Sequence, residues 1–355
     1  MPKIMVAMSG GVDSSAVALK LKNEGHYVAG GTLILHDKNI KGNEKSCGSE
    51  KDVRDAKAVA EKLEIEHYMF DYRNDFNKNV MERFVSVYQS GATPNPCIFC
   101  NRYVKFPKMI EEAEKLGFDY IATGHYARVK YDEKSGRYLL LRAVDRNKDQ
   151  TYVLYNLTQH ELAHILFPLG DETDKESVRK MAEEGGLVNA RKRDSQDICF
   201  VPDGDYAAFI TRFTGDEQDG GSFVTMSGEF IAKSKPISSY TIGQRKGLGV
   251  ALGKPQFVIK KSVEENKVYL GDEEHLFTTE AVVTDLNFIS IEKLTEPIEV
   301  TAKTRYSQKE AKAVISPLEN GDVELKFTEP QRAITSGQSA VFYDGDIVVG
   351  GGIIK

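Results

Sequence analysis

The sequence of 355 residues contains only four cysteines and no long apolar run. A membrane-spanning helix needs about 20 consecutive apolar residues, so we expect no membrane span. Met1-Pro2-Lys3 leads directly into an apolar segment, which leaves no room for a signal peptide and favours a cytoplasmic protein. In a cytoplasmic chain, four cysteines indicate reactive or metal-binding thiols and argue against a disulfide framework.

An excess of basic residues is also absent, since the formal net charge is −6. This charge argues against indiscriminate nucleic-acid binding, although a local basic surface would still allow specific phosphate contacts. The hydrophobic content of 41% and the charged content of 28% are typical of globular proteins. The length leaves room for two or three domains, and the sequence shows neither a fixed-period repeat nor a low-complexity tract.

Residues 9–15, Ser-Gly-Gly-Val-Asp-Ser-Ser, lack the Gly-Lys-Ser/Thr ending of a Walker A loop but still indicate a phosphate site. They lie between an apolar run, expected to be a buried strand, and a segment with helical spacing. Glycines at such a turn let the backbone approach phosphate oxygens, and the N–H groups at the helix start favour negative charge. The serine hydroxyls add donors, and Asp13 is placed to hold Mg²⁺ between phosphates.

A capped turn between a strand and a helix would use the same residue types for purely local reasons. The complete heptad, however, resembles the PP-loop of the N-type ATP pyrophosphatases, which split ATP into AMP and pyrophosphate. This resemblance implies ATP as the bound nucleotide and leaves the acceptor open. The nucleotide contacts expected around the loop are Ala7, Met8, Ser9, Gly10, Gly11, Val12, Asp13 and Ser14.

Strand-like and helix-like segments alternate through the first half of the sequence. We expect strands at 27–35, 66–70 and 120–123, and helices at 51–63, 74–90 and 105–116. This alternation predicts βαβ units and a parallel sheet. Ligands of such sheets bind beyond the carboxyl ends of the strands, where the loop at 9–15 lies.

The pattern changes after about residue 150. Helices are expected at 156–165 and 175–184, and the chain beyond Pro202 is expected to be all-β, with hairpin turns at 227–228, 265–266, 320–321 and 344–345. The predicted fold is therefore α/β, with a parallel-sheet PP-loop domain followed by two small β-rich domains. The predicted domains are an ATP-binding catalytic domain at 1–205, a central β domain at 206–275 and a C-terminal β-barrel domain at 276–355.

Two of the cysteines, Cys97 and Cys100, lie close together in a proline-flanked segment just before a predicted helix. The dipole of that helix is expected to lower the pKa of both thiols. Cys199 lies far along the chain, and a lone cysteine of this kind could equally be an inert core residue. A zinc site usually needs four ligands, often in two close pairs. The second pair is missing here, and Cys47, as a fourth ligand, lies in a segment that reads as a loose loop.

Six motifs taken together identify a family. They are SGGVDSS at 9–15, NPCIFCN at 95–101, GHYAR at 124–128, KDQTYVLY at 148–155, DSQDICF at 194–200 and YTIGQRKGLG at 240–249. In this order and combination, the chain resembles the bacterial tRNA-specific 2-thiouridylases over essentially its whole length.

This resemblance implies sulfur transfer to carbon 2 of the wobble uridine in certain tRNAs. The 2-carbonyl oxygen is a poor leaving group, so ATP first adenylates it, and sulfur then displaces AMP. In the family, the position of Cys199 carries a persulfide received from a cysteine desulfurase or a sulfur-relay protein. The position of Cys100 acts as nucleophile or resolving thiol, and a transient disulfide between Cys100 and Cys199 follows.

The resemblance also implies binding residues. Leu33 and Gly124 match nucleotide contacts of the family. Lys148-Asp149-Gln150 and Arg305-Tyr306 match its tRNA-binding segments, which makes the β-barrel at 276–355 the expected tRNA-binding domain. A flipped wobble base is expected near Asn95, Pro96 and Cys97. A single Lys or Arg usually marks only a solvated surface, so the family match carries these assignments.

Cys97 is a departure from the family pattern, because many members carry aspartate there as an acid or base. A thiol cannot take that part with the same pKa. Cys97, Cys100 and Cys199 together could instead hold a [4Fe–4S] cluster with one iron open for sulfide. The sequence therefore leaves persulfide relay and cluster-bound sulfur both open.

Two other classes of protein share some of these features. A PP-loop amidotransferase or synthetase would need an ammonia source, yet the sequence has no glutaminase-sized domain. A metal-binding RNA adaptor would use the paired cysteines and the β domains without catalysis, which the intact PP-loop argues against.

Overall fold

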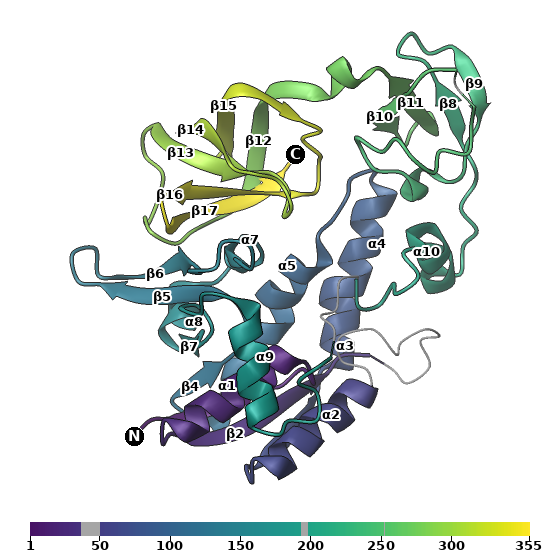
Figure 1. The fold of residues 1–355 in the computed structure, drawn as a ribbon. Coiled ribbons are helices and arrows are strands. Elements are labelled where there is room, and N and C mark those ends of the chain that lie inside the picture. Colours follow the sequence, from purple (N-terminus) through teal and green to yellow (C-terminus); the bar gives the residue numbers. More distant parts are fainter. Residues whose placement is uncertain (37–49, 193–197, 252) are drawn as a thin grey trace.

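A five-stranded parallel sheet forms the centre of the N-terminal part of the protein (Figure 1). The computed structural model describes residues 1–36, 50–192, 198–251 and 253–355. The strand order is β3-β2-β1-β4-β7, and every neighbouring pair is parallel, which confirms the expected sheet. The strands are β1 (Lys3–Ala7), β2 (Tyr27–Ile34), β3 (His67–Asp71), β4 (Tyr120–Ala122) and β7 (Ile165–Leu166).

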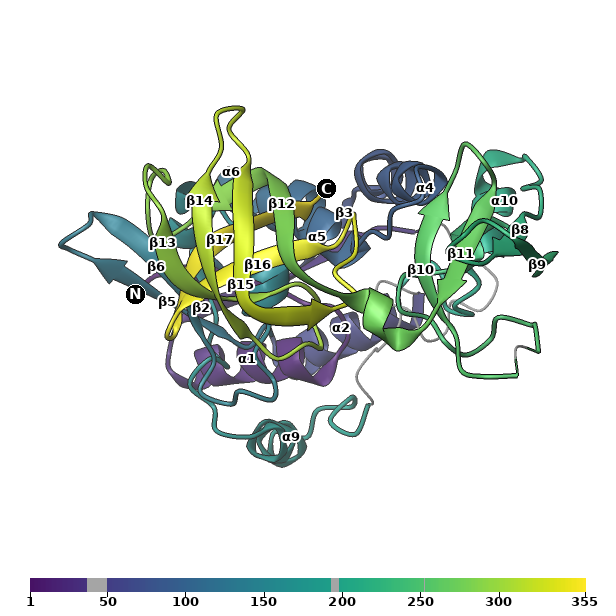
Figure 2. The same ribbon diagram turned by 90° about the horizontal axis from the view of Figure 1, so that it is seen from above.

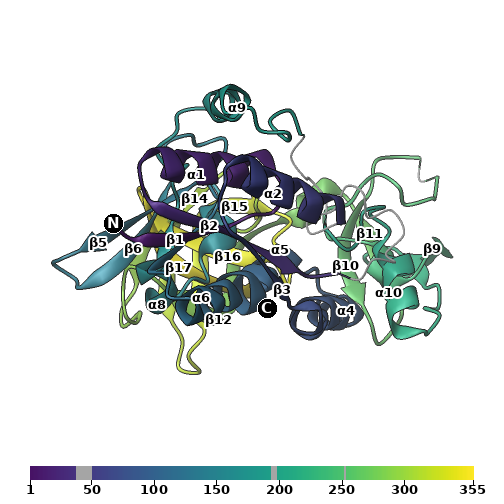
Figure 3. The ribbon, with the colours of Figure 1, turned by 90° about the horizontal axis from the view of Figure 1, so that it is seen from below.

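Helices cover both faces of this sheet (Figure 3). Within β1, Ile4 and Val6 face one core and Met5 faces the other, as the two-residue period of a strand requires. The face of Ile4 and Val6 packs against α1 (Val12–Asn23), α2 (Glu50–Lys62) and α9 (Lys175–Glu184). The other face packs against α4 (Glu82–Gln89) and α6 (Phe106–Lys115). Within the described ranges, every helix falls short of the length and apolarity that crossing a bilayer requires.

Two helical segments on the second face contain π-helical turns. The first is α3 (Arg73–Phe76), η2 (Asn77–Met81) and α4, and the second is α5 (Pro96–Cys100), η3 (Asn101–Lys105) and α6. The second segment begins well before the expected start at 105, because Asn95 caps it and Pro96 occupies its first position. The cysteine pair therefore lies inside the helical segment rather than before it.

A hairpin and two short helices lie between β4 and β7 in the chain. They are β5 (Ala127–Asp132), β6 (Arg137–Arg142), α7 (Thr151–Leu154) and α8 (Gln159–Ala163). The prediction of a helix over 156–165 is too long at both ends. Thr158 and Glu161 form a capping box that starts the helix at 159, and β7 begins at Ile165.

The central part of the chain contains a helix and a four-stranded sheet. The helix α10 (Tyr206–Thr214) contradicts the expectation of an all-β chain beyond Pro202. Asp205 caps this helix, which buries Phe209 and Ile210. The sheet order is β10-β11-β8-β9, and the predicted hairpin turns at 227–228 and 265–266 are confirmed. Its elements are β8 (Ser222–Val224), β9 (Phe230–Lys233), η4 (Ile237–Ser239), β10 (Phe257–Ser262) and β11 (Lys267–Gly271).

The C-terminal part is a closed six-stranded barrel, reached through η5 (Glu273–Leu276). The strands follow the order β12-β15-β14-β13-β16-β17, and β17 pairs back with β12, which leaves no open edge in the ring. The hairpin turns at 320–321 and 344–345 are also confirmed. The strands are β12 (Phe277–Phe288), β13 (Ile298–Lys303), β14 (Ala311–Pro317), β15 (Val323–Arg332), β16 (Ser339–Asp344) and β17 (Ile347–Ile354).

The barrel is fastened to the N-terminal part by buried hydrogen bonds near α7. Tyr152 donates its hydroxyl to the Ser339 carbonyl at 2.8 Å, and the hydroxyls of Tyr155 and Ser339 lie 3.0 Å apart. A Cβ on Gly351 would lie 2.8 Å from the Tyr155 ring, so glycine permits this close approach. Strand β17 also pairs with β6 through Ile347 and Leu141. Seen from above, the central sheet lies to one side of the barrel, beyond α4 (Figure 2).

Candidate active site

The phosphate loop lies between β1 and α1, at the carboxyl edge of the parallel sheet. Gly10 has a φ of +71°, a conformation that glycine adopts without strain. The Ser14 hydroxyl accepts from the Ser9 N–H at 3.2 Å and donates to the Gly11 carbonyl at 3.1 Å. Ser9 is exposed, and Gly11 and Asp13 are half-buried. The predicted turn is thus a pre-formed loop whose surface an anion can reach.

Two glycines let other segments press against this loop. A Cβ on Gly10 would lie 2.2 Å from the Asp52 carbonyl oxygen of α2. A Cβ on Gly124, just beyond β4, would lie 2.7 Å from the Ser14 nitrogen and 2.8 Å from the Asp13 Cβ. The structure therefore places Gly124 directly beside the start of α1, as its proposed nucleotide contact requires. Leu33 is nearly buried and lies near the carboxyl end of β2, on the same edge of the sheet.

Asp13 has two partners that sequence reasoning missed. Lys175, the first residue of α9, donates to one carboxylate oxygen at 2.7 Å. The hydroxyl of buried Tyr126 donates to the other oxygen at 3.1 Å. An ammonium group and a half-exposed carboxylate at the loop suit a site for phosphates and Mg²⁺. Lys175 could not be singled out from the sequence, because it lies 162 residues from Asp13 among ordinary helix residues.

A second lysine ties the segment before Cys199 to the loop. Lys192 donates to the Gly10 carbonyl at 3.1 Å and to the carboxylates of Asp52 and Asp55 at 2.6 and 2.5 Å. Burial disfavours the ammonium form, but the two carboxylates outweigh burial and raise the pKa of Lys192. Asn189 adds a bond to Gly10 at 3.0 Å. The chain that leads towards Cys199 is therefore anchored at the phosphate loop.

The cysteine pair is presented by the start of the helical segment at 96–115. The Asn95 side chain accepts from the Cys97 N–H at 3.2 Å, which fixes the first turn after Pro96. Cys97 is exposed, whereas Cys100 and Cys199 are half-buried and pack against the same core. Both cysteines, which are far apart in the sequence, therefore border the core on the same face of the parallel sheet. Cys47 and residues 194–197 of the DSQDICF motif lie outside the described residues.

The prediction that the helix dipole lowers the pKa of Cys97 is wrong. Surrounding protein desolvates the thiolate and raises the pKa of Cys97, while the positive charge of Lys105 opposes the shift. Desolvation is the largest cause of this shift and outweighs the charge of Lys105. A raised pKa favours the protonated thiol of Cys97, and the thiol is a weaker nucleophile than the thiolate.

Tyrosines of two domains form an aromatic pair. Tyr306, which follows β13, is 45% exposed, and its ring centre lies 6.0 Å from that of Tyr152 in α7. The Lys303 ammonium lies 5.8 and 5.9 Å from the two ring centres. Burial, the Asp149 carboxylate and the Cys97 thiolate all raise the pKa of Tyr306, so these groups share one electrostatic neighbourhood. An exposed ring with a cation beside it can stack on a nucleic-acid base.

The side chains of Asp149 and Gln150 shape the turn before α7. Asp149 accepts from the Ala143 N–H at 3.0 Å and from the Thr151 hydroxyl at 2.7 Å. Gln150 and Tyr126 exchange two bonds of 2.9 Å, one through the Gln150 side chain and one between backbones. Lys148 is half-buried in the same turn. Because Tyr126 also bonds Asp13, this turn is linked to the phosphate loop.

Arg305 joins the barrel to the central domain. Its guanidinium donates to the carbonyls of Ile242 and Ala333 at 2.9 and 2.8 Å and to the Thr335 hydroxyl at 2.6 Å. Burial lowers the pKa of Arg305. These bonds give Arg305 a structural role, and a contact with tRNA phosphate stays a prediction.

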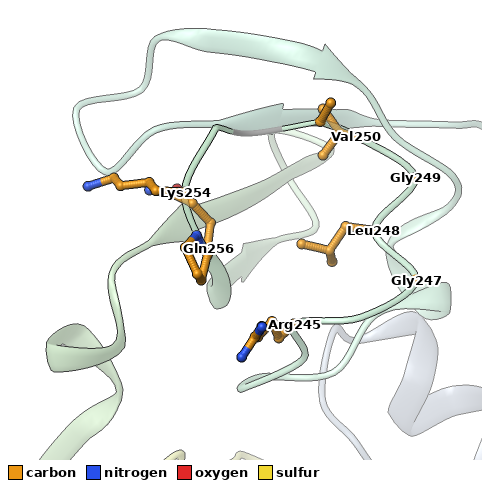
Figure 4. A pocket seen from close by; sticks show the side chains of 9 residues that line it. Arg245, Gly247, Leu248, Gly249, Val250, Lys254 and Gln256 are labelled. Atoms are coloured by element: carbon orange, nitrogen blue, oxygen red, sulfur yellow. The ribbon is translucent and has the colours of Figure 1, made fainter.

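A pocket of about 440 Å³ lies in the central domain, between Arg245 on one side and Lys254 on the other (Figure 4). Arg245 belongs to the YTIGQRKGLG motif, whose loop forms one wall of the pocket. This pocket is separate from the phosphate loop, which lies on the N-terminal sheet.

Three family models match the chain in succession. A model described as tRNA methyl transferase HUP domain matches residues 2–203, a tRNA methyl transferase PRC-barrel domain matches 207–272 and an Aminomethyltransferase beta-barrel domain matches 278–354. The tRNA-specific 2-thiouridylase MnmA of Acetivibrio thermocellus is 53% identical over 356 residues, which cover 99% of each chain. The chain belongs to the tRNA-specific 2-thiouridylase family.

Other relatives agree with this membership. The tRNA-specific 2-thiouridylase MnmA of Caldicellulosiruptor saccharolyticus is also 53% identical, over 99% of this chain and 98% of its own. A solved complex of a 4-thiouridine synthetase with RNA and bound ATP is 16% identical and covers 57% of this chain and 45% of its own. Its TM-score is 0.34, so this structural likeness is too weak to support a functional assignment.

Replacement of Gly124 by alanine tests whether the close contact with α1 matters for nucleotide binding. The new Cβ would have to displace Ser14 or Asp13, and a displaced loop makes poorer hydrogen bonds to phosphate. We expect ATP affinity, measured by calorimetry, to fall by about tenfold or more. Lys134→Ala is the control, because it changes an exposed side chain in the turn between β5 and β6. Equal ATP affinity in the two variants would contradict the assignment of Gly124.

Proposed function

We propose that this enzyme uses ATP to convert the wobble uridine of its tRNA substrates to 2-thiouridine. The observation that carries the proposal is full-length similarity to relatives named tRNA-specific 2-thiouridylase, at 53% identity. The structure supports residue roles, because one hydrogen-bond chain links the phosphate loop to the turn at 148–150, whose Asp149 acts electrostatically on Tyr306. The reaction has two steps, activation of the uridine and sulfur transfer.

In the first step, the uridine O2 attacks the α-phosphorus of ATP and pyrophosphate leaves. The loop at 9–14 would hold the phosphates through its backbone N–H groups and serine hydroxyls. Lys175 lies against Asp13 and would offset charge on the leaving pyrophosphate. Bound Mg²⁺ would neutralise phosphate oxygens, and Asp13 is the residue that would hold it.

In the second step, the terminal sulfur of a persulfide on Cys199 attacks carbon 2 of the uridine, and AMP leaves with the original oxygen. The Cys100 thiolate then attacks the Cys199 sulfur, which breaks the S–S bond and leaves the outer sulfur on the tRNA. The products are 2-thiouridine, AMP and a Cys100–Cys199 disulfide. A dithiol reductant must reduce that disulfide, and a cysteine desulfurase or sulfur-relay protein must reload Cys199.

A second arrangement is supported by Cys97, whose thiol shares the neighbourhood of Tyr306. Cys97, Cys100 and Cys199 provide the thiol set of a [4Fe–4S] cluster, which would supply an iron open to sulfide. Cys97 follows Asn95 at the start of the helix, while the other two thiols share a core. We place persulfide relay first, because the family resemblance favours it and it needs only two thiols.

Asp13→Asn should abolish the first step while tRNA binding survives. The amide keeps the shape of the side chain but loses its charge, its pairing with Lys175 and its affinity for Mg²⁺. We expect tRNA-dependent pyrophosphate release to fall by about a hundredfold or more. Glu172→Gln is a matched control, because it removes another ion pair with α1, to Lys20 at 2.8 Å, away from the loop. Release near the unmodified rate in Asp13→Asn would disprove the role of Asp13.

Tyr306→Ala should weaken tRNA binding without changing ATP affinity. Stacking of a base on an aromatic ring contributes about 1–3 kcal/mol, so we expect roughly 5- to 150-fold weaker binding of an anticodon stem-loop. Tyr306→Phe should bind almost normally, since the ring remains. Tyr131→Ala, at an exposed tyrosine of β5, is the control. Unchanged affinity of Tyr306→Ala in fluorescence anisotropy would remove this residue from the tRNA site.

Serine substitutions of the three cysteines distinguish the two sulfur arrangements. Under persulfide relay, Cys100→Ser and Cys199→Ser lose thiolation, whereas Cys97→Ser keeps appreciable activity with a persulfide donor. The measurement is anaerobic thiolation of an anticodon stem-loop, together with iron per protein and the visible spectrum. Each variant should still release pyrophosphate, which shows that activation is intact. If Cys97→Ser folds normally but loses iron and thiolation together, the cluster arrangement replaces the relay.

A further inference from the structure

Three metal-binding side chains meet on the surface where α6 and α8 pack against each other (Figure 3). Glu114 lies in the last turn of α6, and His160 and His164 lie four residues apart along α8 and its C-cap. One ligand atom from each lies within 4.8 Å of the others. Among the described residues, this is the one group of three or more His, Cys, Asp or Glu side chains with that geometry. The reaction described above uses none of them.

The hydrogen bond of His164 prepares that ring for metal binding. Its Nδ1 lies 2.8 Å from the His160 carbonyl oxygen, which can only accept. Nδ1 therefore carries the proton, and the lone pair of the neutral ring is on Nε2. A backbone carbonyl that holds one ring nitrogen while the other faces a metal is the usual support of a histidine ligand.

The other two ligands already face each other. His160 Nε2 and Glu114 Oε1 lie 3.7 Å apart, and the two histidine ring centres lie 4.5 Å apart. Ligands bonded to zinc at about 2.0–2.2 Å in a tetrahedron lie about 3.3 Å from one another, so small side-chain rotations would close the site. The carboxyl end of α6 also carries partial negative charge, which favours a cation beside Glu114.

The position of the group separates it from the reaction. His164 immediately precedes β7, and β7 runs parallel to β1 and β4. The group therefore lies at the amino edge of the sheet, whereas the phosphate loop leaves the carboxyl edge. Glu114 nevertheless belongs to the helical segment at 96–115 that carries Cys97 and Cys100 at its other end.

We propose that Glu114, His160 and His164 bind one divalent transition ion of the zinc class, with water in the remaining position. Two imidazoles and one carboxylate suit Zn²⁺ and Co²⁺, and three protein ligands leave the fourth position open. The bound ion fastens α8 to the end of the helical segment that presents the cysteines. This proposal is independent of the proposed thiolation.

Cobalt binding tests the site, because Co²⁺ reports its ligands in the visible spectrum. The four cysteines would also bind cobalt, so the full chain with all four replaced by serine is titrated with Co²⁺. In parallel, the unmodified chain and its His160→Ala variant are titrated with Co²⁺. The difference between their spectra reports this site alone, even if the cysteine-free chain folds poorly. Glu114→Gln is the second variant. Glu111→Gln, one turn earlier in α6, is the matched control.

One cobalt ion per chain should bind, with d–d bands and without a thiolate charge-transfer band, and Zn²⁺ should displace it. His160→Ala and Glu114→Gln should each weaken binding by at least about tenfold, while Glu111→Gln binds normally. Zn²⁺ should also raise the thermal unfolding midpoint of the unmodified chain but not that of Glu114→Gln. The proposal would be overturned if His160→Ala had the same cobalt spectrum and cobalt affinity as the chain with His160 intact. Binding only at millimolar cobalt would also overturn it.

Discussion

Hydrogen bonds of Tyr126 connect the phosphate loop to the rest of the candidate active site. Its hydroxyl holds Asp13 at 3.1 Å, and its backbone exchanges two bonds of 2.9 Å with Gln150. Burial of Tyr126 keeps water from competing for these bonds, so their geometry is preserved. The turn that starts α7, and with it Tyr152, is thereby positioned relative to the start of α1. A nucleotide on the loop and a base beside Tyr152 would then be held by one connected structure.

The barrel completes this arrangement from the other end of the chain. Tyr152 and Tyr155 both reach Ser339, and Arg102 pairs with Asp285 of β12. These contacts place Tyr306 of the barrel beside Tyr152 of α7. Arg305 holds the barrel to the central domain at the same time. The candidate site therefore contains residues of both domains. The polar groups buried at this interface form hydrogen bonds with each other, which avoids the free-energy penalty of unpaired buried groups.

Local sequence patterns predicted those parts of the structure that depend on neighbours in the chain. The phosphate loop, the parallel sheet and the hairpin turns follow from glycines, serines and short periodic segments. The predicted helix at 156–165 is too long because the capping box of Thr158 and Glu161 starts the helix only at 159. Lys175, Lys192 and Tyr126 were missed because their partners lie more than 100 residues away. The pKa of Cys97 is shifted upward, opposite to the prediction, because desolvation of the thiolate outweighs the effect of the helix start.

The central claim is that one chain activates the uridine oxygen with ATP and then replaces it with sulfur. Its most direct test follows that oxygen. A tRNA anticodon stem-loop with oxygen-18 at O2 of the wobble uridine is thiolated by the enzyme with ATP and a persulfide donor, and the AMP is analysed by mass spectrometry. The account predicts that the label appears in the phosphate of AMP, in equal amount to the 2-thiouridine formed. Unlabelled AMP beside fully formed 2-thiouridine would contradict adenylation of the uridine.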